Sequence, residues 1–188
     1  MGYSKAHVEA TRTKIVSTAN RLFRQQGYER TSIDQIMEKS GLTRGGFYAH
    51  FKSKADLFTQ AMKTDLNFTL AVETQRVNNP NDETAALSDA LAYYLDRRNV
   101  NRVGNACTLV TLTPEIARMG TAARSAFTES LEQLLGSFTE VMGDRQKAMQ
   151  AIQVSVGALL LARTVSCQRL REELLESGQL QAQALAAT

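Results

Sequence analysis

Apolar residues recur along most of this chain at the three- and four-residue spacing that is typical of helices. The chain has no tryptophan and only two prolines, whereas alanine, leucine, glutamine, glutamate and arginine are plentiful. The pattern therefore predicts an all-α protein. We expect helices over about residues 10–26, 32–40, 43–51, 53–77, 83–98, 105–112, 114–119, 121–142, 145–165 and 168–186, with the clearest linker over residues 78–82.

The stretch over residues 31–57 carries the most information. Ser32 is a suitable N-cap, and Gln35, three residues later, completes a capping box. Gly41 is expected to end this helix, because glycine tolerates the left-handed backbone conformation. Thr43 is then expected to cap a second helix. Two short helices joined by a turn of about 3–4 residues that contains glycine form a helix-turn-helix unit, whose second helix enters the DNA major groove.

Two adjacent glycines, Gly45 and Gly46, lie inside this second helix, where each costs roughly 1 kcal/mol relative to alanine. One explanation is that the helix backbone must come close to another surface. The alternative is a frayed or kinked surface turn. The polar residues that follow favour the first explanation, because hydroxyl, imidazole and ammonium groups suit phosphate oxygens. Those residues are Tyr48, His50, Lys52 and Lys54.

Together with the helix before it, this segment resembles the DNA-binding domain of the TetR family of bacterial transcriptional regulators. The resemblance covers roughly residues 10–62, with order, spacing and residue type in agreement. The matching residues are Ile15, Ala19, Leu22, Phe23, Gly27, Tyr28, Thr31, Ser32, Ile36, Gly41, Tyr48, Phe51, Lys54, Leu57 and Phe58. The rest of the chain resembles the family's helical body loosely, and most closely members with a cysteine near the start of its middle segment.

The resemblance implies a three-helix helix-turn-helix DNA-binding domain over residues 1–52 and a helical-bundle ligand-binding and dimerisation domain over residues 53–188. It also implies a repressor that binds a pseudo-palindromic operator on double-stranded DNA as a homodimer and is released by an inducer, an unknown small molecule. A different class remains open, namely a helical small-molecule carrier or interaction module without operator binding. The Tyr48, His50 and Lys54 set argues against this second class.

Base contacts are expected mainly from Thr43, Arg44 and the glycine backbone, since arginine pairs well with guanine. The expected DNA-binding residues are Thr31, Ser32, Gln35, Thr43, Arg44, Gly45, Gly46, Tyr48, His50, Lys52 and Lys54.

The charge distribution is uneven along the chain. Residues 1–63 hold 11 Lys or Arg and 5 Asp or Glu, a net charge of +6, whereas residues 64–188 hold 11 and 14, a net charge of −3. A basic N-terminal third fits a nucleic-acid-binding unit. Chance clustering of charged residues would give the same pattern, so the charge distribution alone does not establish nucleic-acid binding.

The helix expected over residues 145–165 is apolar around most of its circumference and must be buried on more than one side. We expect one face to pack on its own subunit and the other on a second copy. In the resembled family, the last two helices of each subunit form a four-helix dimer bundle. The alternative is that both faces are buried within one subunit.

A ligand pocket is expected among the helices at about residues 60–165. The candidate lining residues, each of which fits core packing equally well, are Leu66, Leu70, Leu91, Tyr94, Leu109, Phe127 and Leu131. Cys107 is the candidate sensing residue, because a thiol at a helix start has a lowered pKa and is more nucleophilic. The alternative is that Cys107 is a small buried hydrophobe. Cys167 is expected to be inert.

Enzyme chemistry has little support. The two histidines, His7 and His50, take part in no Ser-His-Asp arrangement or metal-ligand spacing, and no P-loop or dinucleotide-binding motif is present. We therefore expect no catalysis, no cofactor and no metal. The first residues lack the apolar stretch of a signal peptide, and no apolar run is long enough to span a membrane. These features predict a cytoplasmic protein.

Overall fold

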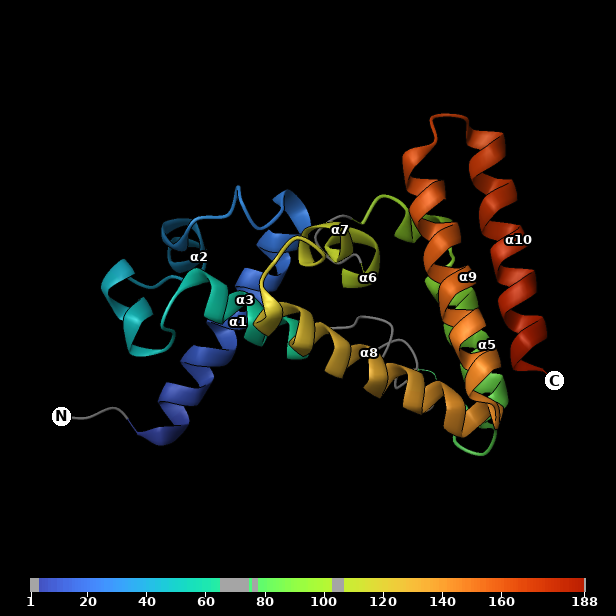
Figure 1. Ribbon diagram of the computed structural model, residues 1–188, viewed down its shortest axis with the longest axis horizontal. Helices are drawn as coiled ribbons and strands as arrows, with labels where there is room; N and C mark the ends of the chain where they lie inside the picture. The colour runs from blue at the N-terminus through green and yellow to red at the C-terminus, as the bar shows by residue number, and fades with distance from the viewer. Residues whose placement is uncertain (1–3, 65–74, 76–77, 103–106, 188) are drawn as a thin grey trace. The chain divides into compact units, whose positions relative to one another are not determined.

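The computed structural model describes residues 4–64, 75, 78–102 and 107–187. Within these residues every regular element is a helix, which confirms the predicted all-α fold. The elements are α1 (Lys5–Gln26), α2 (Ile33–Lys39), η1 (Arg44–Ala49), α3 (Lys54–Thr64), α5 (Glu83–Tyr94), η2 (Arg97–Asn99), α6 (Thr108–Thr111), α7 (Thr113–Ile116), α8 (Thr121–Met142), α9 (Arg145–Thr164) and α10 (Gln168–Ala186) (Figure 1).

The chain forms two compact units that interleave in sequence. The first contains the described residues within Met1–Asp65 and Thr111–Ser130, and the second those within Leu66–Val110 and Leu131–Thr188. Helix α3 thus packs in the first unit, although the predicted domain boundary lies just before it. Helix α8 contributes residues to both units.

One hydrophobic core holds the first unit together. Phe23 from α1 and Phe58 from α3 are fully buried, and their ring centroids lie 5.0 Å apart with a nearly perpendicular arrangement that aromatic rings favour. Residues far along the chain complete this core, namely Leu112, Ile116, Ala123 and Ala126. The helix-turn-helix is therefore not an isolated N-terminal module, because α7 and the start of α8 supply part of its interior.

Helix α1 begins at Lys5, with Ser4 as its N-cap, rather than at about residue 10 as predicted, whereas its predicted end and both predicted ends of α2 are confirmed. The Ser32 hydroxyl accepts a hydrogen bond from the Gln35 amide at 3.1 Å, and the Gln35 side chain accepts one from the Ser32 amide at 2.9 Å, which is the expected capping box. Gly27 and Gly41 have φ values of 85° and 68°, which most side chains avoid. These two glycines therefore end α1 and α2.

The second helix of the helix-turn-helix differs from its prediction. It is a 3₁₀-helix over Arg44–Ala49 rather than an α-helix over about residues 43–51. Thr43 occupies the N-cap position, but its side chain makes no capping hydrogen bond. Two adjacent glycines account for the difference, because they weaken the α-helical preference of a short segment.

The second unit is built around the hairpin of α9 and α10, which lie side by side in Figure 1, and α10 also packs on α5. A side-chain carbon at Gly178 on α10 would clash with Ala158 on α9, so the absence of a side chain allows the close approach. The Gln183 amide donates a 3.0 Å hydrogen bond to the Ser88 hydroxyl and so ties α10 to α5.

The predicted helices of the second half agree well with the structure at α8, α9 and α10. The helix expected over residues 83–98 ends earlier, at Tyr94, and a short 3₁₀-helix follows. The helices expected over residues 105–112 and 114–119 are each a single turn, α6 and α7. Most of the predicted extension of α3 to residue 77 lies outside the described residues.

Candidate nucleic-acid interface

Helix η1 is anchored on one side and exposed on the others. Phe47 is fully buried against Phe51, with ring centroids 5.7 Å apart. Tyr48, the next residue along, is 61% exposed, which is unusual for a large aromatic side chain. Thr43, Arg44 and Gly45 are exposed beside it. The structure therefore presents most of the predicted base-contacting residues together on one accessible short helix.

The described part of the chain gives no structural reason why the exposed position 45 should be a glycine. Its φ is not positive, and a side-chain carbon built on it would meet no atom within 4 Å. Gly46 is similar, since a side-chain carbon there would make only an ordinary contact with Met37 at 3.7 Å. Neither backbone conformation nor crowding inside the protein requires glycine here.

Arg44, the predicted base-reading residue, forms an ion pair with Asp34 on α2. The distance from Arg44 Nη1 to Asp34 Oδ2 is 3.0 Å, and the two side chains are 68% and 58% exposed. Sequence reasoning missed Asp34, although an acidic residue in the first turn of α2 is visible in the sequence. The pair joins the exposed guanidinium on η1 to the first turn of α2.

Lys54 lies in a different environment from the other predicted phosphate-binding residues. Its ammonium group donates to the carbonyl oxygens of Tyr28 at 2.9 Å and Thr31 at 3.1 Å, and it lies 4.1 Å from the centre of the Tyr28 ring. Thr31 is fully buried, and its hydroxyl donates to the Gly27 carbonyl at 2.7 Å. Both side chains thus have bonding partners inside the protein.

The remaining predicted DNA-binding residues lie around η1 and differ in how far they take part in hydrogen bonds within the protein. Ser32 and Gln35 are exposed but engaged in the α2 capping box. The His50 carbonyl accepts a 2.6 Å hydrogen bond from Arg12 on α1, which fixes the end of η1. The Lys52 side chain is exposed. The Lys52 amide donates to the Asp56 carboxylate at 2.8 Å.

The Asp56 carboxylate stabilises the start of α3. Its hydrogen bond from the Gln60 side chain, followed by the one from the Lys52 amide, lowers the pKa of Asp56 below its ordinary value. The Ser53 hydroxyl accepts from the Asp56 amide at 3.0 Å, as expected for an N-cap. The loop between η1 and α3 is therefore well ordered by local hydrogen bonds.

The described residues among those predicted to line a pocket are divided between the two units. Leu91, Tyr94 and Leu109 are buried in the second unit, whereas Phe127 packs against the core of the first unit. Leu131 is partly buried in the second unit. Leu66 and Leu70 lie outside the described residues.

Cys107 belongs to a polar cluster with Tyr94, which is buried as well, and Arg163, which is partly buried. Burial raises the pKa of the Tyr94 hydroxyl well above its ordinary value, and the charge of Cys107 and its hydrogen bond with Tyr94 add to this rise. Arg163 acts in the opposite direction, and burial lowers its own pKa. The Nη1 atom of Arg163 is buried and has no hydrogen-bond partner in the described part of the chain, and the same is true of the Thr108 hydroxyl.

The surroundings of Cys107 differ from those that the sequence predicts. Helix α6 begins at Thr108 but has only four residues, so its dipole is small. The nearby cation instead comes from Arg163, which the sequence shows as the single charge in an otherwise apolar stretch of α9. Cys167 is exposed at the start of α10.

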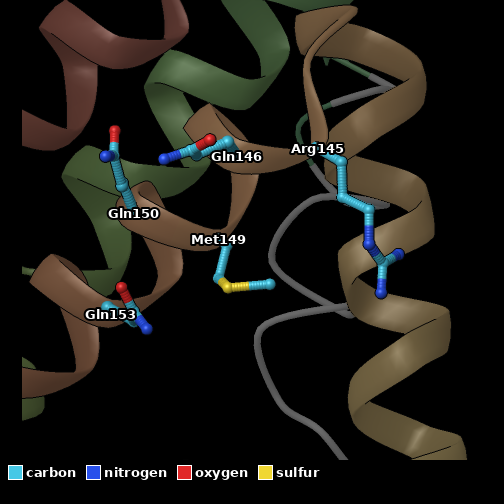
Figure 2. A pocket seen from close by; sticks show the side chains of 5 residues that line it. All are labelled: Arg145, Gln146, Met149, Gln150 and Gln153. Atoms are coloured by element: carbon cyan, nitrogen blue, oxygen red, sulfur yellow. The ribbon is translucent and has the colours of Figure 1, made fainter.

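A separate open pocket of about 430 Å³ lies on the surface of α9. It is lined by Arg145, Gln146, Met149, Gln150 and Gln153, and Figure 2 shows these side chains along the first turns of the helix. Arg145 is also paired with Glu132 on α8 at 2.7 Å. Leu91, Tyr94, Leu109, Phe127 and Leu131 are not among these lining residues.

No group of His, Cys, Asp or Glu side chains within residues 4–64, 75, 78–102 and 107–187 is arranged to hold a metal ion. Across the same residues, no helix is both long enough and apolar enough to cross a membrane.

Comparison with known proteins agrees with this geometry. Residues 15–61 match the family described as "Bacterial regulatory proteins, tetR family". The chain is 34% identical over 94 residues to the HTH-type transcriptional regulator AcrR of Shigella flexneri, a match that covers 50% of this chain and 44% of AcrR. It is 33% identical over 94 residues to the transposon Tn10 TetC protein of Escherichia coli, covering 50% and 47%. The matches thus span under half the length of these relatives.

Solved structures share the fold over nearly the whole chain. The reduced form of E. coli NemR has a TM-score of 0.71 at 17% identity, covering 92% of this chain and 95% of that one. A TetR-family regulator from Cytophaga hutchinsonii has a TM-score of 0.72 at 21% identity, covering 97% and 96%. At these identities the likeness concerns the fold alone.

The helix-turn-helix with its exposed second helix is the class of domain through which many transcriptional regulators bind DNA. Residues 15–61 thus match the helix-turn-helix domain of the TetR family of bacterial regulatory proteins, and the chain as a whole shares the fold of a solved TetR-family regulator.

Proposed function

We propose that the protein is a cytoplasmic repressor that binds a pseudo-palindromic operator as a homodimer and leaves it when a small-molecule inducer binds the helical body. The observation that carries this proposal is the exposed η1 surface, where Gly45 has open space around it and Tyr48 is 61% exposed. Nothing inside the described protein requires a glycine at position 45, so the missing side chain fits a backbone that closely approaches an external surface. The duplex is that surface.

The contacts to DNA divide into two groups. Thr43, Arg44 and the backbone at Gly45 and Gly46 lie where base edges would be read. Tyr48, His50 and Lys52 follow and suit phosphate oxygens. Lys54 and Thr31, whose polar groups are engaged inside the protein, support the turn before α2 and take a smaller direct part than the sequence predicts.

Homodimer formation is supported by apolar side chains that stay exposed on α9 and α10. Leu160 and Leu161 on α9 are 43% and 52% exposed, and Leu170 and Leu180 on α10 are 42% and 63% exposed. A single subunit leaves this apolar surface in water, where a second copy would cover it. Two-fold pairing of this kind matches a pseudo-palindromic operator.

The body is proposed to sense the inducer near Cys107. The buried Arg163 Nη1 and the Thr108 hydroxyl lack hydrogen-bond partners in the described part of the chain, and such groups are costly unless something pairs with them. An inducer with an anionic or carbonyl oxygen would pair with these donors. Cys107 then acts either as a reactive thiol or as part of the pocket wall. Binding in one body conformation but not the other shifts the population away from the DNA-competent state.

The direct test is selection of duplexes from fragmented genomic DNA by the purified full chain. A repressor of this type recovers a small set of fragments that share one pseudo-palindromic sequence. A carrier or interaction module without operator binding would enrich no common sequence.

A further inference from the structure

The turn between α1 and α2 is held by a residue from a distant part of the chain. The Tyr28 amide donates a 2.6 Å hydrogen bond to Glu115 Oε2, and Glu115 lies on α7, 87 positions further along the sequence. A bond this short to a carboxylate is charge-assisted and stronger than a bond between neutral groups. Both residues belong to the first compact unit.

Gly27 makes room for this carboxylate. A side-chain carbon on Gly27 would lie 2.5 Å from Glu115 Oε1, so the carboxylate would have to move from its place beside the Tyr28 amide. Gly27 also has a φ of 85°. Its lack of a side chain therefore serves two purposes, because it ends α1 and admits Glu115 to the backbone of the turn.

Lys54 holds the same turn from its carbonyl side. Its ammonium group binds the carbonyl oxygens of Tyr28 and Thr31, while Glu115 binds the Tyr28 amide. The Glu115 carboxylate thus binds an amide of the turn, and the oppositely charged Lys54 ammonium group binds its carbonyl oxygens. Thr31 is followed directly by Ser32, the N-cap of α2, so the position of this turn sets the start of the helix-turn-helix.

The link continues from α2 to η1. Met37 on α2 lies against Gly46, and Asp34 on α2 pairs with Arg44. A displacement of the turn therefore moves the surface that would read DNA. On its own side, Glu115 is fixed by its neighbours Leu112 and Ile116, both buried in the core of the first unit. Only eight positions separate Glu115 from Cys107 in the sequence.

We propose that Glu115 is a positioning residue for DNA binding, which holds the turn before the helix-turn-helix in place through the Tyr28 amide. The inference rests on the proposed function, because it assigns a supporting residue to the same DNA-binding surface. Glu115 acts through the turn and is assigned no contact with DNA of its own. Loss of its hydrogen bond to the Tyr28 amide loosens the turn.

The test compares Glu115→Ala and Glu115→Gln with Glu129→Ala as a matched control. Glu129 is an exposed carboxylate of the same unit, paired with Lys63 and remote in sequence from the turn. Amide hydrogen exchange is followed along the full chain, and affinity is measured on a duplex selected by the unmodified protein, over a range of salt concentrations.

Glu115→Ala is expected to accelerate exchange of the Tyr28 amide and to weaken binding to the selected duplex by about tenfold, because one charge-assisted hydrogen bond is lost. The slope of log affinity against log salt should stay unchanged, since no phosphate contact is removed. Glu115→Gln keeps an oxygen acceptor and should lose about threefold or less. Glu129→Ala should leave the exchange and the affinity as they are.

Three results would overturn the inference. The first is unchanged affinity in Glu115→Ala despite faster Tyr28 exchange. The second is a salt slope that falls by about 0.9, as loss of a direct phosphate contact would cause. The third is faster exchange throughout α9 and α10, which would mean a role in folding alone. If the unmodified protein selects no duplex, the proposed function fails. Comparison of Tyr28 amide exchange between the Glu115 and Glu129 variants still tests whether Glu115 stabilises the turn.

Discussion

The guanidinium of Arg44 lies 3.0 Å from the carboxylate of Asp34, so the residue assigned to read a base already has an anionic partner. Both side chains are mostly exposed, and an exposed pair of this kind is worth about 1 kcal/mol or less. Guanine offers Arg44 two acceptors in the major groove, which is enough to displace Asp34. The pair therefore orients Arg44 without blocking it.

Replacing Arg44 with alanine should cost roughly 1–3 kcal/mol of binding to the preferred duplex and relax the preference at one base pair in each half-site. Asp34→Asn serves as the partner variant. It frees the guanidinium and removes a negative charge near DNA, so binding to random duplex should strengthen. Titration of both variants on preferred and scrambled duplexes measures this. Equal weakening on the two duplexes by Arg44→Ala would show that Arg44 contacts only the backbone.

The two lysines beside η1 should behave differently. Lys52→Ala should flatten the slope of log affinity against log salt by about 0.9 and leave thermal stability unchanged, since its side chain is exposed. Lys54→Ala should lower the melting temperature, because the carbonyl oxygens of Tyr28 and Thr31 lose their donor. Thermal unfolding and salt titrations of both variants test this. A Lys54→Ala protein with normal stability and a flattened salt slope would mean that Lys54 contacts a DNA phosphate, as the sequence predicts.

Leu161 should lie in the dimer interface. Leu161→Glu should shift the protein from dimer to monomer at micromolar concentration, because dimerisation would bury an unpaired charge. Gln153→Glu, on the exposed surface of the same helix, is the charge control and should remain dimeric. Light scattering gives the masses. A monomeric mass for the unmodified chain would rule out the proposed pairing of α9 and α10.

Cys107 should matter for release from DNA and Cys167 should not. Cys107→Ser is expected to keep operator binding but to lose release by an electrophile such as a quinone, if the thiol itself reacts. Cys167→Ser, exposed at the start of α10, should respond like the unmodified protein. Anisotropy of the bound duplex with and without the electrophile tests both. Normal release of Cys107→Ser would leave Cys107 a role only in the pocket wall.

Tyr94 should make stability depend on pH in the alkaline range. Its pKa is raised in the folded state by burial, so the unfolded chain loses this proton first as the pH rises. The contribution of the hydroxyl is thus complete below about pH 10 and declines above it. Tyr94→Phe should cost about 1 kcal/mol at pH 8 and progressively less above pH 10. Urea unfolding at several pH values measures the difference, and a constant difference would mean that the hydroxyl does not titrate as described.

Local patterns in the sequence predicted the helices that depend on local chemistry. The capping box at Ser32 and Gln35 and the glycine end of α1 are examples, because each involves residues a few positions apart. The predicted α-helix at η1 was wrong, since two glycines outweighed the periodic apolar pattern.

Contacts between distant residues could not be read in the same way. Lys54 pairs with carbonyl groups 23 and 26 positions away, and Glu115 reaches Tyr28 across 87 positions. Neither spacing follows from any local periodicity. The DNA-binding role of the η1 residues and the sensing role of Cys107 stay predictions.

The most direct test of the account is the affinity of the unmodified protein for its selected duplex, compared with the same duplex carrying five extra base pairs between the half-sites. Five base pairs turn one half-site by about half a helical turn, out of reach of the second subunit. We predict two chains bound per original duplex, an affinity about 10³-fold or more above that for scrambled DNA, and near-complete loss of that preference after the insertion. Equal affinity for the original, extended and scrambled duplexes would contradict it.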